Sequence, residues 1–374
     1  MKVAIVTDWF APRRGGIEGQ LLELAERLGA RGHAVDVITS TPNASGGDAF
    51  RLRQLDVVRI PVVQLAVASP TLVRSLRREL ARGYEVVHAH VSVVSPVGYA
   101  AAAIARSLDL ATVITFHSVL RHKRHLLRLV NMLAGLAKGD VSWTAVSELV
   151  AGQARDAFGG ADVSVLPNGV DLGFWTSPSM PSPTRDGCVT LISTMRLHRK
   201  KRPLELLRAF VQAAQRARSS ARLVIIGDGP ERAKLERLAH DAGVEVELAG
   251  WQDREQLRAL YARADGFVLA SIREAFGIAA LEARAAGLPV IAMAASGSNE
   301  FLRHGQDALL CRDDEDLVRQ IARFIGDASL RATLAQTPVA LERYDWGAVI
   351  AAHETAYQRV MKRVVSAELV AASA

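Results

Sequence analysis

The stretch VAIVTDWFAPRRGGIEGQLLELAERLGARGHAVDVIT, residues 3–39, decides the fold class. Its first five residues are apolar or β-branched and predict a buried strand. Residues 17–32 repeat apolar side chains at helical spacing and end in a glycine, which is typical of a helix C-terminus. A further apolar run at 34–39 predicts another strand. Strand, helix and strand in this order form a parallel βαβ unit, so the segment predicts an α/β fold.

Strand and helix patterns alternate in the same way along the rest of the chain, in two series. The first series ends with VSVLP at 163–167, and the second begins with CVTLIST at 188–194. Between them, TSPSMPSPTRDG at 176–187 is rich in proline and serine and lacks apolar periodicity, which is typical of a linker. We therefore expect two Rossmann-like, doubly wound parallel-sheet domains that face each other across a ligand-binding cleft. The expected parts are an N-terminal domain of residues 1–175, a linker of 176–187, a C-terminal domain of 188–344 and a final helical segment of 345–374.

Composition narrows the class of protein further. The 374 residues are 49% hydrophobic but only 5% aromatic, as expected for parallel sheets covered by helices. The net charge of +7 favours anionic ligands or an anionic membrane face, and signatures of nucleic-acid-reading modules are missing, so no nucleic-acid partner is expected. Cys188 and Cys311 are expected to be buried free thiols. With neither a signal peptide nor a membrane-spanning run in the sequence, we expect a cytoplasmic protein, soluble or peripheral on the membrane.

Two short segments follow predicted strands and are suited to binding an anion. Gly15 and Gly16 stand before the first helix, where backbone N–H groups can approach a phosphate, although the spacing is not the dinucleotide fingerprint. Arg196 and Lys201 follow the strand at 188–194 and precede a helix that starts near Pro203. A guanidinium fork and a point charge at this position suit a diphosphate. An ordinary flexible turn and a solvated basic loop remain the alternative interpretations.

The segment SIREAFGIAALEAR at 271–284 carries two glutamates, Glu274 and Glu282, eight residues apart. Phe276 and Gly277 fall where a helix is expected to begin. Eight residues span about 12 Å along a helix, more than the roughly 5 to 9.5 Å between the two carboxyl groups of a glycosidase. The spacing therefore disfavours a two-carboxylate hydrolase. It suits two carboxylates that bind hydroxyl groups at opposite ends of a ligand longer than one sugar.

Three histidines lie at the ends of predicted strands. His117 ends the strand ATVITFH, at the carboxyl edge where ligands of such sheets bind, and is a candidate functional residue. His88 and His90 alternate in VVHAHV and are expected on one face of a strand. We expect these two to be hydrogen-bonded structural residues, since no spacing supplies a third metal ligand.

Two charged segments leave both a functional and a structural interpretation open. Asp314 and Asp316 form a D-x-D pair that could hold a metal and a diphosphate, but acids before a helix are typical of capping. Residues 110–139 contain no acid, and at 118–138 basic and apolar side chains are interleaved. A helix of this kind can lie on an anionic membrane, or it can simply be solvated.

Several motifs occur together and in a fixed order: GGIE, TFH, VLPNGVD, R-L-x-x-x-K, IIGDGP and REAFGIAALEARAAGLPVIA. In this combination the chain resembles the retaining family 4 glycosyltransferases of the GT-B fold. The resemblance covers nearly the whole sequence, and its most specific part is the pair of glutamates. One departure is that Arg202 and Pro203 follow Lys201, where the family often has glycine.

The resemblance implies a role for each motif position. Gly15 and Gly16 would line the donor phosphate site, and Arg196 and Lys201 would stabilise the leaving nucleoside diphosphate. Glu274 would lie near the donor sugar, Glu282 would hold the ribose, and His117 would lie near the donor sugar and the acceptor. Backbone N–H groups of Phe276, Gly277 and Ile278 would contact sugar and phosphate. The helix at 345–374 would return to pack on the first domain.

The implied reaction moves a hexose from a nucleoside-diphosphate sugar, such as GDP-mannose or a UDP-hexose, to a hydroxyl acceptor with retention and without metal. A lipid or a cell-envelope or exopolysaccharide precursor is the expected acceptor, and a soluble metabolite is the alternative. A non-catalytic nucleotide-sugar-binding protein is a further alternative. An NAD-dependent Rossmann enzyme is disfavoured because the first turn lacks G-x-G-x-x-G.

Overall fold

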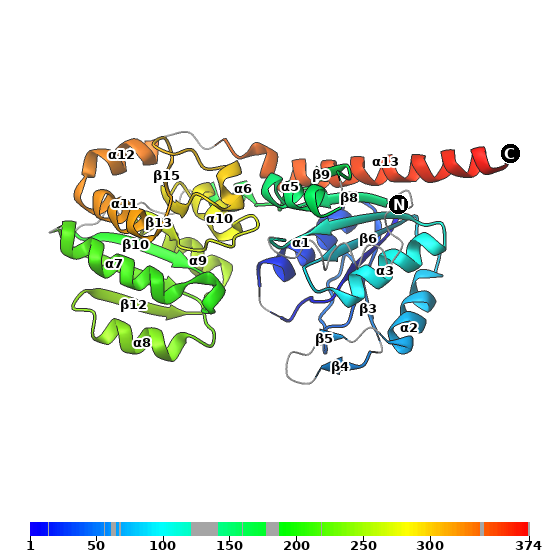
Figure 1. Ribbon diagram of the computed structural model, residues 1–374, viewed down its shortest axis with the longest axis horizontal. Coiled ribbons are helices and arrows are strands. Elements are labelled where there is room, and N and C mark those ends of the chain that lie inside the picture. Colours follow the sequence, from blue (N-terminus) through cyan, green and yellow to red (C-terminus); the bar gives the residue numbers. More distant parts are fainter. Residues whose placement is uncertain are drawn as a thin grey trace. The chain divides into compact units, whose positions relative to one another are not determined.

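The computed structural model separates into two compact units (Figure 1). Unit 1 comprises Met1–Gly169 and Trp346–Ala374, and unit 2 comprises Val170–Asp345. The structure describes residues 1–13, 15–55, 57–60, 65–66, 69–120, 141–158, 160–176, 187–217, 219–336 and 340–372. The predicted linker therefore lies mostly outside the described residues, as does nearly all of the basic stretch at 118–138.

Unit 1 is built on a parallel sheet with the strand order β3-β2-β1-β6-β7-β8-β9. Its strands are β1 (Lys2–Thr7), β2 (Ala34–Thr39), β3 (Arg51–Gln54), β6 (Val86–Val91), β7 (Ala111–Phe116), β8 (Val141–Ala145) and β9 (Val163–Val165). A separate antiparallel pair consists of β4 (Arg59–Ile60) and β5 (Leu65–Ala66). The described helices of this unit are α1 (Gly16–Ala30), α2 (Pro70–Leu80), α3 (Pro96–Ser107), α5 (Glu148–Ala157) and α13 (Trp346–Ala372).

Alternating residues of these strands face two separate hydrophobic cores. Val3 and Ile5 of β1 pack in a core with α1 and α13, whereas Ala4 and Val6 pack in a core with α2 and α3. This alternation follows from the period of two along a strand, and helices on both faces of a parallel sheet are the expected solution for burying it. Helix α13 is thus the last element of the chain and also part of the core of unit 1.

Unit 2 has a second parallel sheet, with the strand order β12-β11-β10-β13-β14-β15. Its strands are β10 (Val189–Thr194), β11 (Ala221–Ile226), β12 (Glu245–Gly250), β13 (Gly266–Leu269), β14 (Val290–Met293) and β15 (Ala308–Cys311). Its described helices are α6 (Leu172–Thr176), α7 (Pro203–Ala217), α8 (Arg232–His240), α9 (Arg254–Tyr261), α10 (Ile278–Ala285), α11 (Asp314–Gly326) and α12 (Ala328–Gln336), with short 3-10 turns η1 (Arg199–Lys201), η2 (Gly297–Glu300) and η3 (Glu342–Tyr344).

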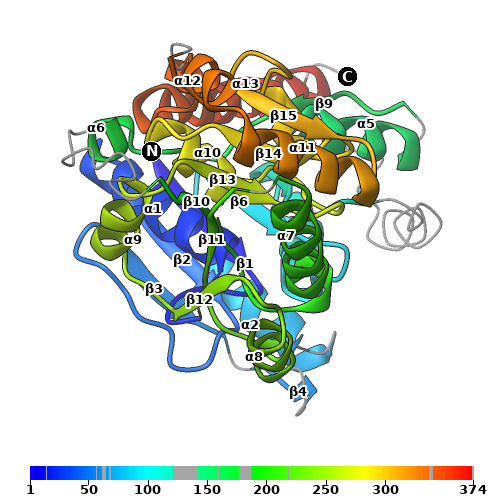
Figure 2. The same cartoon turned by 90° about the vertical axis from the view of Figure 1, so that its left-hand side faces the viewer.

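Helices α7 and α11 pack against each other on one face of the unit 2 sheet, as Figures 1 and 2 show. The strand order of this unit is that of a dinucleotide-type doubly wound sheet, in which the chain reverses direction of winding between the first and fourth strands, here β10 and β13. The prediction of two doubly wound parallel sheets is confirmed. Cys188 and Cys311 are both buried and free, as predicted. Among the described residues, no helix is long and apolar enough to cross a membrane.

The chain passes from one unit to the other near residue 170, ahead of the predicted linker. Gly169 still belongs to unit 1, where its N–H and C=O bond to the side-chain amide of Gln20, each at 2.8 Å. A Cβ on Gly169 would lie 2.4 Å from the ring of Trp346, so only glycine lets that ring pack here. Val170 is already tied into unit 2, because its N–H bonds to the carbonyl of Tyr344 at 2.8 Å. Backbone pairing on either side of 169–170 therefore sets the changeover.

A chain of hydrogen bonds fastens α13 to the sheet of unit 1. The Tyr357 hydroxyl lies 2.8 Å from His88 Nδ1, and His88 Nε2 lies 2.7 Å from Thr115 Oγ1. Thr115 Oγ1 lies 2.5 Å from Thr144 Oγ1, which donates to the carbonyl of Ile114. His88 is thus a hydrogen-bonded structural histidine, as predicted, and it bonds on both ring nitrogens.

The buried histidines of unit 1 should make its stability depend on pH. Burial lowers the pKa of His88 and His90 well below the usual value and that of His353 to about 4. These groups stay neutral in the folded state and bind protons in the unfolded state below about pH 6.5. Their contribution to stability is therefore complete above that pH and is lost as the pH falls toward the folded pKa, at up to about 1.4 kcal/mol per pH unit for each group.

Urea unfolding at pH 7.5, 6.5 and 5.5 should show a falling free energy of unfolding. The His353→Gln variant removes one titrating group and should show a shallower decrease. Equal free energies at pH 7.5 and 5.5 for the unmodified protein would contradict the prediction.

Candidate active site

The predicted donor-binding residues of unit 2 gather where the sheet changes its direction of winding. Arg196 and Lys201 follow β10, and Glu274 follows β13, its neighbour in the sheet. Because neighbouring parallel strands end at the same edge, the two loops leave the sheet side by side. The Lys201 Nζ lies 2.6 Å from Glu274 Oε2, and the side chain of Glu274 is only 12% exposed. The Ser271 hydroxyl also bonds to the carbonyl of Lys201, at 3.3 Å, and ties the same loops together.

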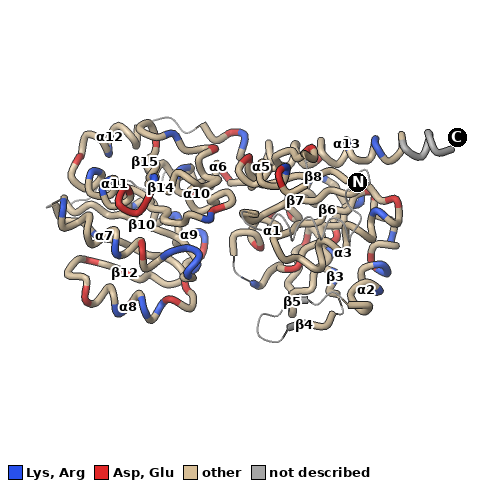
Figure 3. The backbone as a smooth tube through the Cα atoms, in the orientation of Figure 1, with Lys and Arg blue, Asp and Glu red and all other residues tan. Residues whose placement is uncertain are grey.

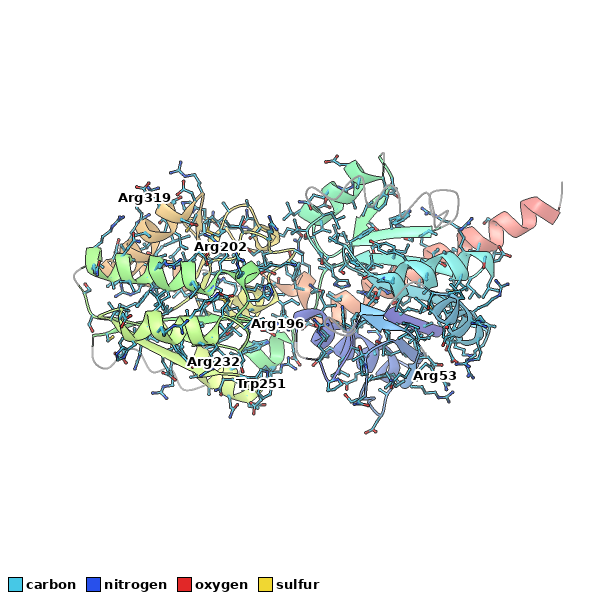
Figure 4. The ribbon with its side chains drawn as sticks, turned by 60° about the horizontal axis from the view of Figure 1, so that its bottom comes forward. Arg53, Arg196, Arg202, Arg232, Trp251 and Arg319 are labelled. Atoms are coloured by element: carbon cyan, nitrogen blue, oxygen red, sulfur yellow. The ribbon has the colours of Figure 1, made fainter. Side chains whose placement is uncertain are left out.

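Arg196 lies at the end of the same strand and is exposed (Figure 4). Within the described part of the chain its guanidinium has no ion-pair or hydrogen-bond partner, so it is available to a ligand. Figure 3 shows the basic run 199–202 at the start of α7. The edge of the sheet therefore carries one cation that is held by a carboxylate and one that is open.

The glycines of IIGDGP position the loop after β10. Gly227 and Gly229 have φ values of +127° and +155°. A Cβ on Gly227 would lie 1.9 Å from the carbonyl oxygen of Met195, and one on Gly229 would lie 2.5 Å from that of Leu197. The Leu197 N–H bonds to the carbonyl of Asp228 at 2.9 Å. The motif therefore allows two backbone segments to pack closely around Arg196.

Arg202, where the sequence departs from the family pattern, has a separate role. Its φ of +61° lies in the left-handed region that favours glycine, which explains why glycine suits this position. Its guanidinium, labelled in Figure 4, donates to the carbonyl of Ala270 at 3.2 Å and to Asp314 Oδ2 at 2.6 Å. Of these adjacent bases, Arg202 is thus engaged with α11 and Lys201 with Glu274.

The start of α10 is held rigidly next to Glu274. Gly277 is the N-cap residue with φ +94° and offers no side-chain cap, so the first N–H groups of the helix remain available for an anion. Phe276 is buried, with its ring 5.6 Å from those of Phe301 and Tyr344. The Gly297 N–H bonds to the Glu274 carbonyl at 2.9 Å. Ile278, the first residue of α10, is half-buried.

Glu282 lies one turn further along α10 and is half-buried. Burial, together with the charge of Glu282, raises the pKa of Tyr261 well above its usual value. The Tyr261 hydroxyl donates to Thr194 Oγ1, at the end of β10, at 3.0 Å. Glu282 is thus near the same end of the sheet as Glu274, but it is held by different neighbours.

The acidic run DDED has structural partners (the red segment at the start of α11 in Figure 3). Asp313 caps α11 by accepting from the N–H of Asp316 at 2.8 Å, which confirms the capping interpretation for this segment. Asp314 bonds to Arg202, and Asp316 accepts from Arg312 and Arg319. Searched over the described residues, the chain has no group of three or more His, Cys, Asp or Glu side chains arranged for a metal ion.

In unit 1, His117 follows β7 directly and contacts His90. His90 Nδ1 lies 2.8 Å from His117 Nε2. His90 is 4% exposed, and its Nε2 is buried without a hydrogen-bond partner among the described residues. His117 is half-buried and borders a cavity of about 20 Å³ together with His90, Thr115 and His353. Burial lowers the pKa of His117 to about 3, so the ring is neutral near pH 7.

The predicted phosphate loop of unit 1 holds an acid in the donor-free protein. Gly15 is the N-cap of α1, and Gly16 is its first residue. The Glu18 carboxylate folds back over Gly15, so that a Cβ there would lie 2.2 Å from Glu18 Oε2. Arg13 pairs with Glu18 at 3.1 Å and stacks over the Trp9 ring. A phosphate at this helix start would have to displace the Glu18 carboxylate.

Sequence reasoning missed Arg202, Glu18 and the contact between His90 and His117. The last of these had a signal, because His90 pairs in register with Thr115 on the neighbouring strand, two residues before His117. The other two depend on side-chain directions that no periodicity encodes.

Comparison with known proteins agrees with this arrangement. Residues 14–174 match the glycosyltransferase family 4 and residues 181–337 match the glycosyl transferases group 1. A GDP-mannose-dependent alpha-(1-6)-phosphatidylinositol monomannoside mannosyltransferase of Mycobacterium tuberculosis is 32% identical over 332 residues, which cover 83% of this chain and 84% of the relative. A phosphatidylinositol N-acetylglucosaminyltransferase of Arabidopsis thaliana is 28% identical over 97% of this chain and 83% of its own length.

Solved structures share the fold. Sucrose-phosphate synthase of Thermosynechococcus elongatus superposes with a TM-score of 0.77 at 21% identity, over 97% of this chain and 99% of that one. Together with the two parallel-sheet units, this likeness establishes the GT-B fold. By sequence and by fold, the chain belongs to the group 1, family 4 glycosyltransferases.

Proposed function

We propose that the protein moves a hexose from a nucleoside-diphosphate sugar to the hydroxyl group of a lipid or cell-envelope glycan precursor, with retention of configuration and without a metal ion. The observation that carries the proposal is the contact of Lys201 Nζ with Glu274 Oε2, 2.6 Å apart at the start of α10. An ammonium and a carboxylate at one helix start match the two ends of a sugar phosphate.

The charges at this edge suit a leaving diphosphate. When the glycosidic bond breaks, negative charge develops on the phosphate oxygens and must be stabilised by fixed donors. Lys201, the open guanidinium of Arg196 and the uncapped N–H groups at Gly277 and Ile278 supply such donors. Glu274 then accepts from hydroxyl groups of the sugar, and Glu282 from those of the ribose.

In the donor-free protein, Lys201 and Glu274 neutralise each other. Donor binding would replace this contact with one between Lys201 and phosphate and another between Glu274 and a sugar hydroxyl. Since an ion pair near the surface contributes only about 0–1 kcal/mol, its exchange costs little. The parts proposed for His117, Gly15 and Gly16 in sugar and phosphate binding rest on the family resemblance.

A lipid acceptor is supported by the relatives. The mycobacterial and plant proteins carry phosphatidylinositol in their names, and the mycobacterial one is GDP-mannose-dependent. The net charge of +7 suits an anionic surface. We therefore propose GDP-mannose as the first donor to test, with a UDP-hexose as the alternative, and a cytoplasmic protein that is peripheral on the inner face of the membrane.

The proposal is tested by incubating the purified protein with GDP-mannose, UDP-glucose, UDP-galactose or UDP-N-acetylglucosamine and measuring release of nucleoside diphosphate, first alone and then with phosphatidylinositol vesicles. We expect release from one donor, most strongly from GDP-mannose, and an increase with the lipid. No release from any donor under either condition would contradict a transferase using these sugars.

The Lys201→Ala variant should lower kcat at least about a hundredfold, because the leaving phosphate loses a fixed charge. Lys201→Gln should lower it similarly while keeping a donor to Glu274, which separates loss of charge from loss of packing. The neighbouring Lys200→Ala is the matched control and should leave kcat near the wild-type value. Wild-type rates in both Lys201 variants would reassign the phosphate contact to another base.

Chelation tests the proposed independence from metal. Asp313, Asp314 and Asp316 already have partners within unit 2, while Lys201 and Arg196 supply the positive charge that a metal would otherwise provide. We expect turnover in 5–10 mM EDTA, about the usual chelator range, to equal that in Mg²⁺. A large loss in EDTA that Mg²⁺ restores would show that the acidic run holds a metal during turnover.

A further inference from the structure

We infer that His90 is a positioning residue, which holds His117 in the tautomer with its proton on Nδ1 and so makes His117 a hydrogen-bond donor toward a ligand oxygen. The inference rests on the proposed function, since it deepens the part given there to His117. It goes further by fixing the direction of the hydrogen bond that His117 can offer and by naming the residue that fixes it.

The contact between the two rings allows only two arrangements. Both rings are neutral near pH 7, because burial lowers the pKa of each below its usual value. A single proton therefore lies between His90 Nδ1 and His117 Nε2, 2.8 Å apart. If His90 donates, its Nε2 is a bare lone pair and His117 carries its proton on Nδ1. If His117 donates, His90 must carry a proton on Nε2 and His117 Nδ1 becomes an acceptor.

The surroundings of His90 Nε2 decide between them. This nitrogen is buried and has no hydrogen-bond partner among the described residues. A buried N–H without an acceptor is rarer and costlier than an acceptor without a donor. The arrangement with a bare Nε2 is therefore favoured, and His90 donates from Nδ1. His117 Nε2 is then occupied as an acceptor, and its second nitrogen carries the proton.

The adjacent His88 is fixed in the opposite tautomer, which provides an internal reference. Thr144 uses its only hydroxyl proton on the carbonyl of Ile114, so Thr115 must donate to Thr144. Thr115 then has no proton left for His88, and His88 Nε2 must donate to it. His88 Nδ1 is left to accept from Tyr357. Two rings 3.9 Å apart on one strand thus carry their protons on different nitrogens.

The free nitrogen of His117 defines the class of group it can bind. His117 Nδ1 has no partner among the described residues, and the side chain is half-buried at the carboxyl end of β7. A neutral imidazole with Nδ1–H donates one hydrogen bond and cannot take up a proton at that atom. The matching group is an oxygen with a lone pair, such as a sugar hydroxyl or a phosphate oxygen. His117 therefore orients its ligand by donation and is not a general base.

Ring nitrogens with and without a proton are distinguished by two-bond ¹⁵N–¹H correlation spectra of protein labelled at histidine. At pH 7.5 we expect His117 with Nδ1 protonated and Nε2 bare, and His88 with the reverse pattern. Signals are assigned by their loss in His117→Gln and His88→Asn. Finding Nε2 of His117 protonated in the unmodified protein would overturn the inference, whatever the variants do.

A matched pair of variants tests the direction of control. In His90→Asn and His90→Asp a polar atom takes the place of the imidazole Nδ1, but only the amide can donate. His90→Asp should transfer the His117 proton to Nε2, and His90→Asn should restore it to Nδ1. His88→Asn, whose changed atom faces Tyr357, is the control and should leave the His117 pattern unchanged. An unchanged His117 pattern in His90→Asp would refute positioning by His90.

Kinetics connect the tautomer to turnover. We expect kcat in His90→Asp to fall about tenfold, the factor for losing one neutral hydrogen bond of about 1.4 kcal/mol, with partial recovery in His90→Asn. If the tautomer changes and kcat does not, His117 does not donate to the reacting ligand and the inference fails. If the unmodified protein cleaves no donor, the proposed function fails, while the spectra still decide the tautomer.

Discussion

The contact between Lys201 and Glu274 depends on a constraint imposed by the whole of unit 2. Parallel strands all release their chain at one edge, and the first and fourth strands become neighbours only because the winding reverses between them. Arg196 and Lys201 follow one of these strands and Glu274 the other, so residues about 70 positions apart converge without a dedicated motif. The glycines at 227 and 229 bring the flanking loop close enough to fix Arg196, and Gly277 leaves the start of α10 open. Loops on this edge are thus rigid where they touch each other and available where they face a ligand.

Much of this arrangement could be predicted from the sequence, because it follows from strand order and turn chemistry. Alternation of apolar runs predicts two doubly wound sheets, and placement after a strand predicts that Arg196, Lys201, Glu274 and His117 lie at carboxyl edges. Side-chain directions could not be predicted. Arg202 adopts a backbone conformation that favours glycine and pairs with Asp314, and the Glu18 carboxylate covers Gly15. Both are decided by local packing rather than by spacing. The changeover near residue 170 was also beyond reach, since it depends on backbone pairing with residues 344 and 345.

Buried histidines serve unit 1 in two ways that their spacing alone does not distinguish. His88 links the sheet to α13 through a residue 269 positions away, and every proton in that chain has one possible direction. His90, two residues on and on the same face of the strand, points its bond toward the edge instead, to His117. Low dielectric surroundings make both sets of bonds strong and make any unpaired group costly. The same burial that stabilises the fold at neutral pH therefore also determines which nitrogen of His117 faces a ligand.

Unit 1 is assembled from both ends of the chain, and unit 2 lies between them in sequence. During synthesis the ribosome releases all of unit 2 before it releases α13, which covers one face of the first sheet. The first unit to be started is therefore the last to be finished, and its apolar face, including Val3, Ile5 and Val113, waits for Trp346, Val349 and Tyr357 to arrive. A nascent chain held at this stage presents a sticky sheet beside a finished nucleotide-binding unit, which makes it a natural client for a chaperone.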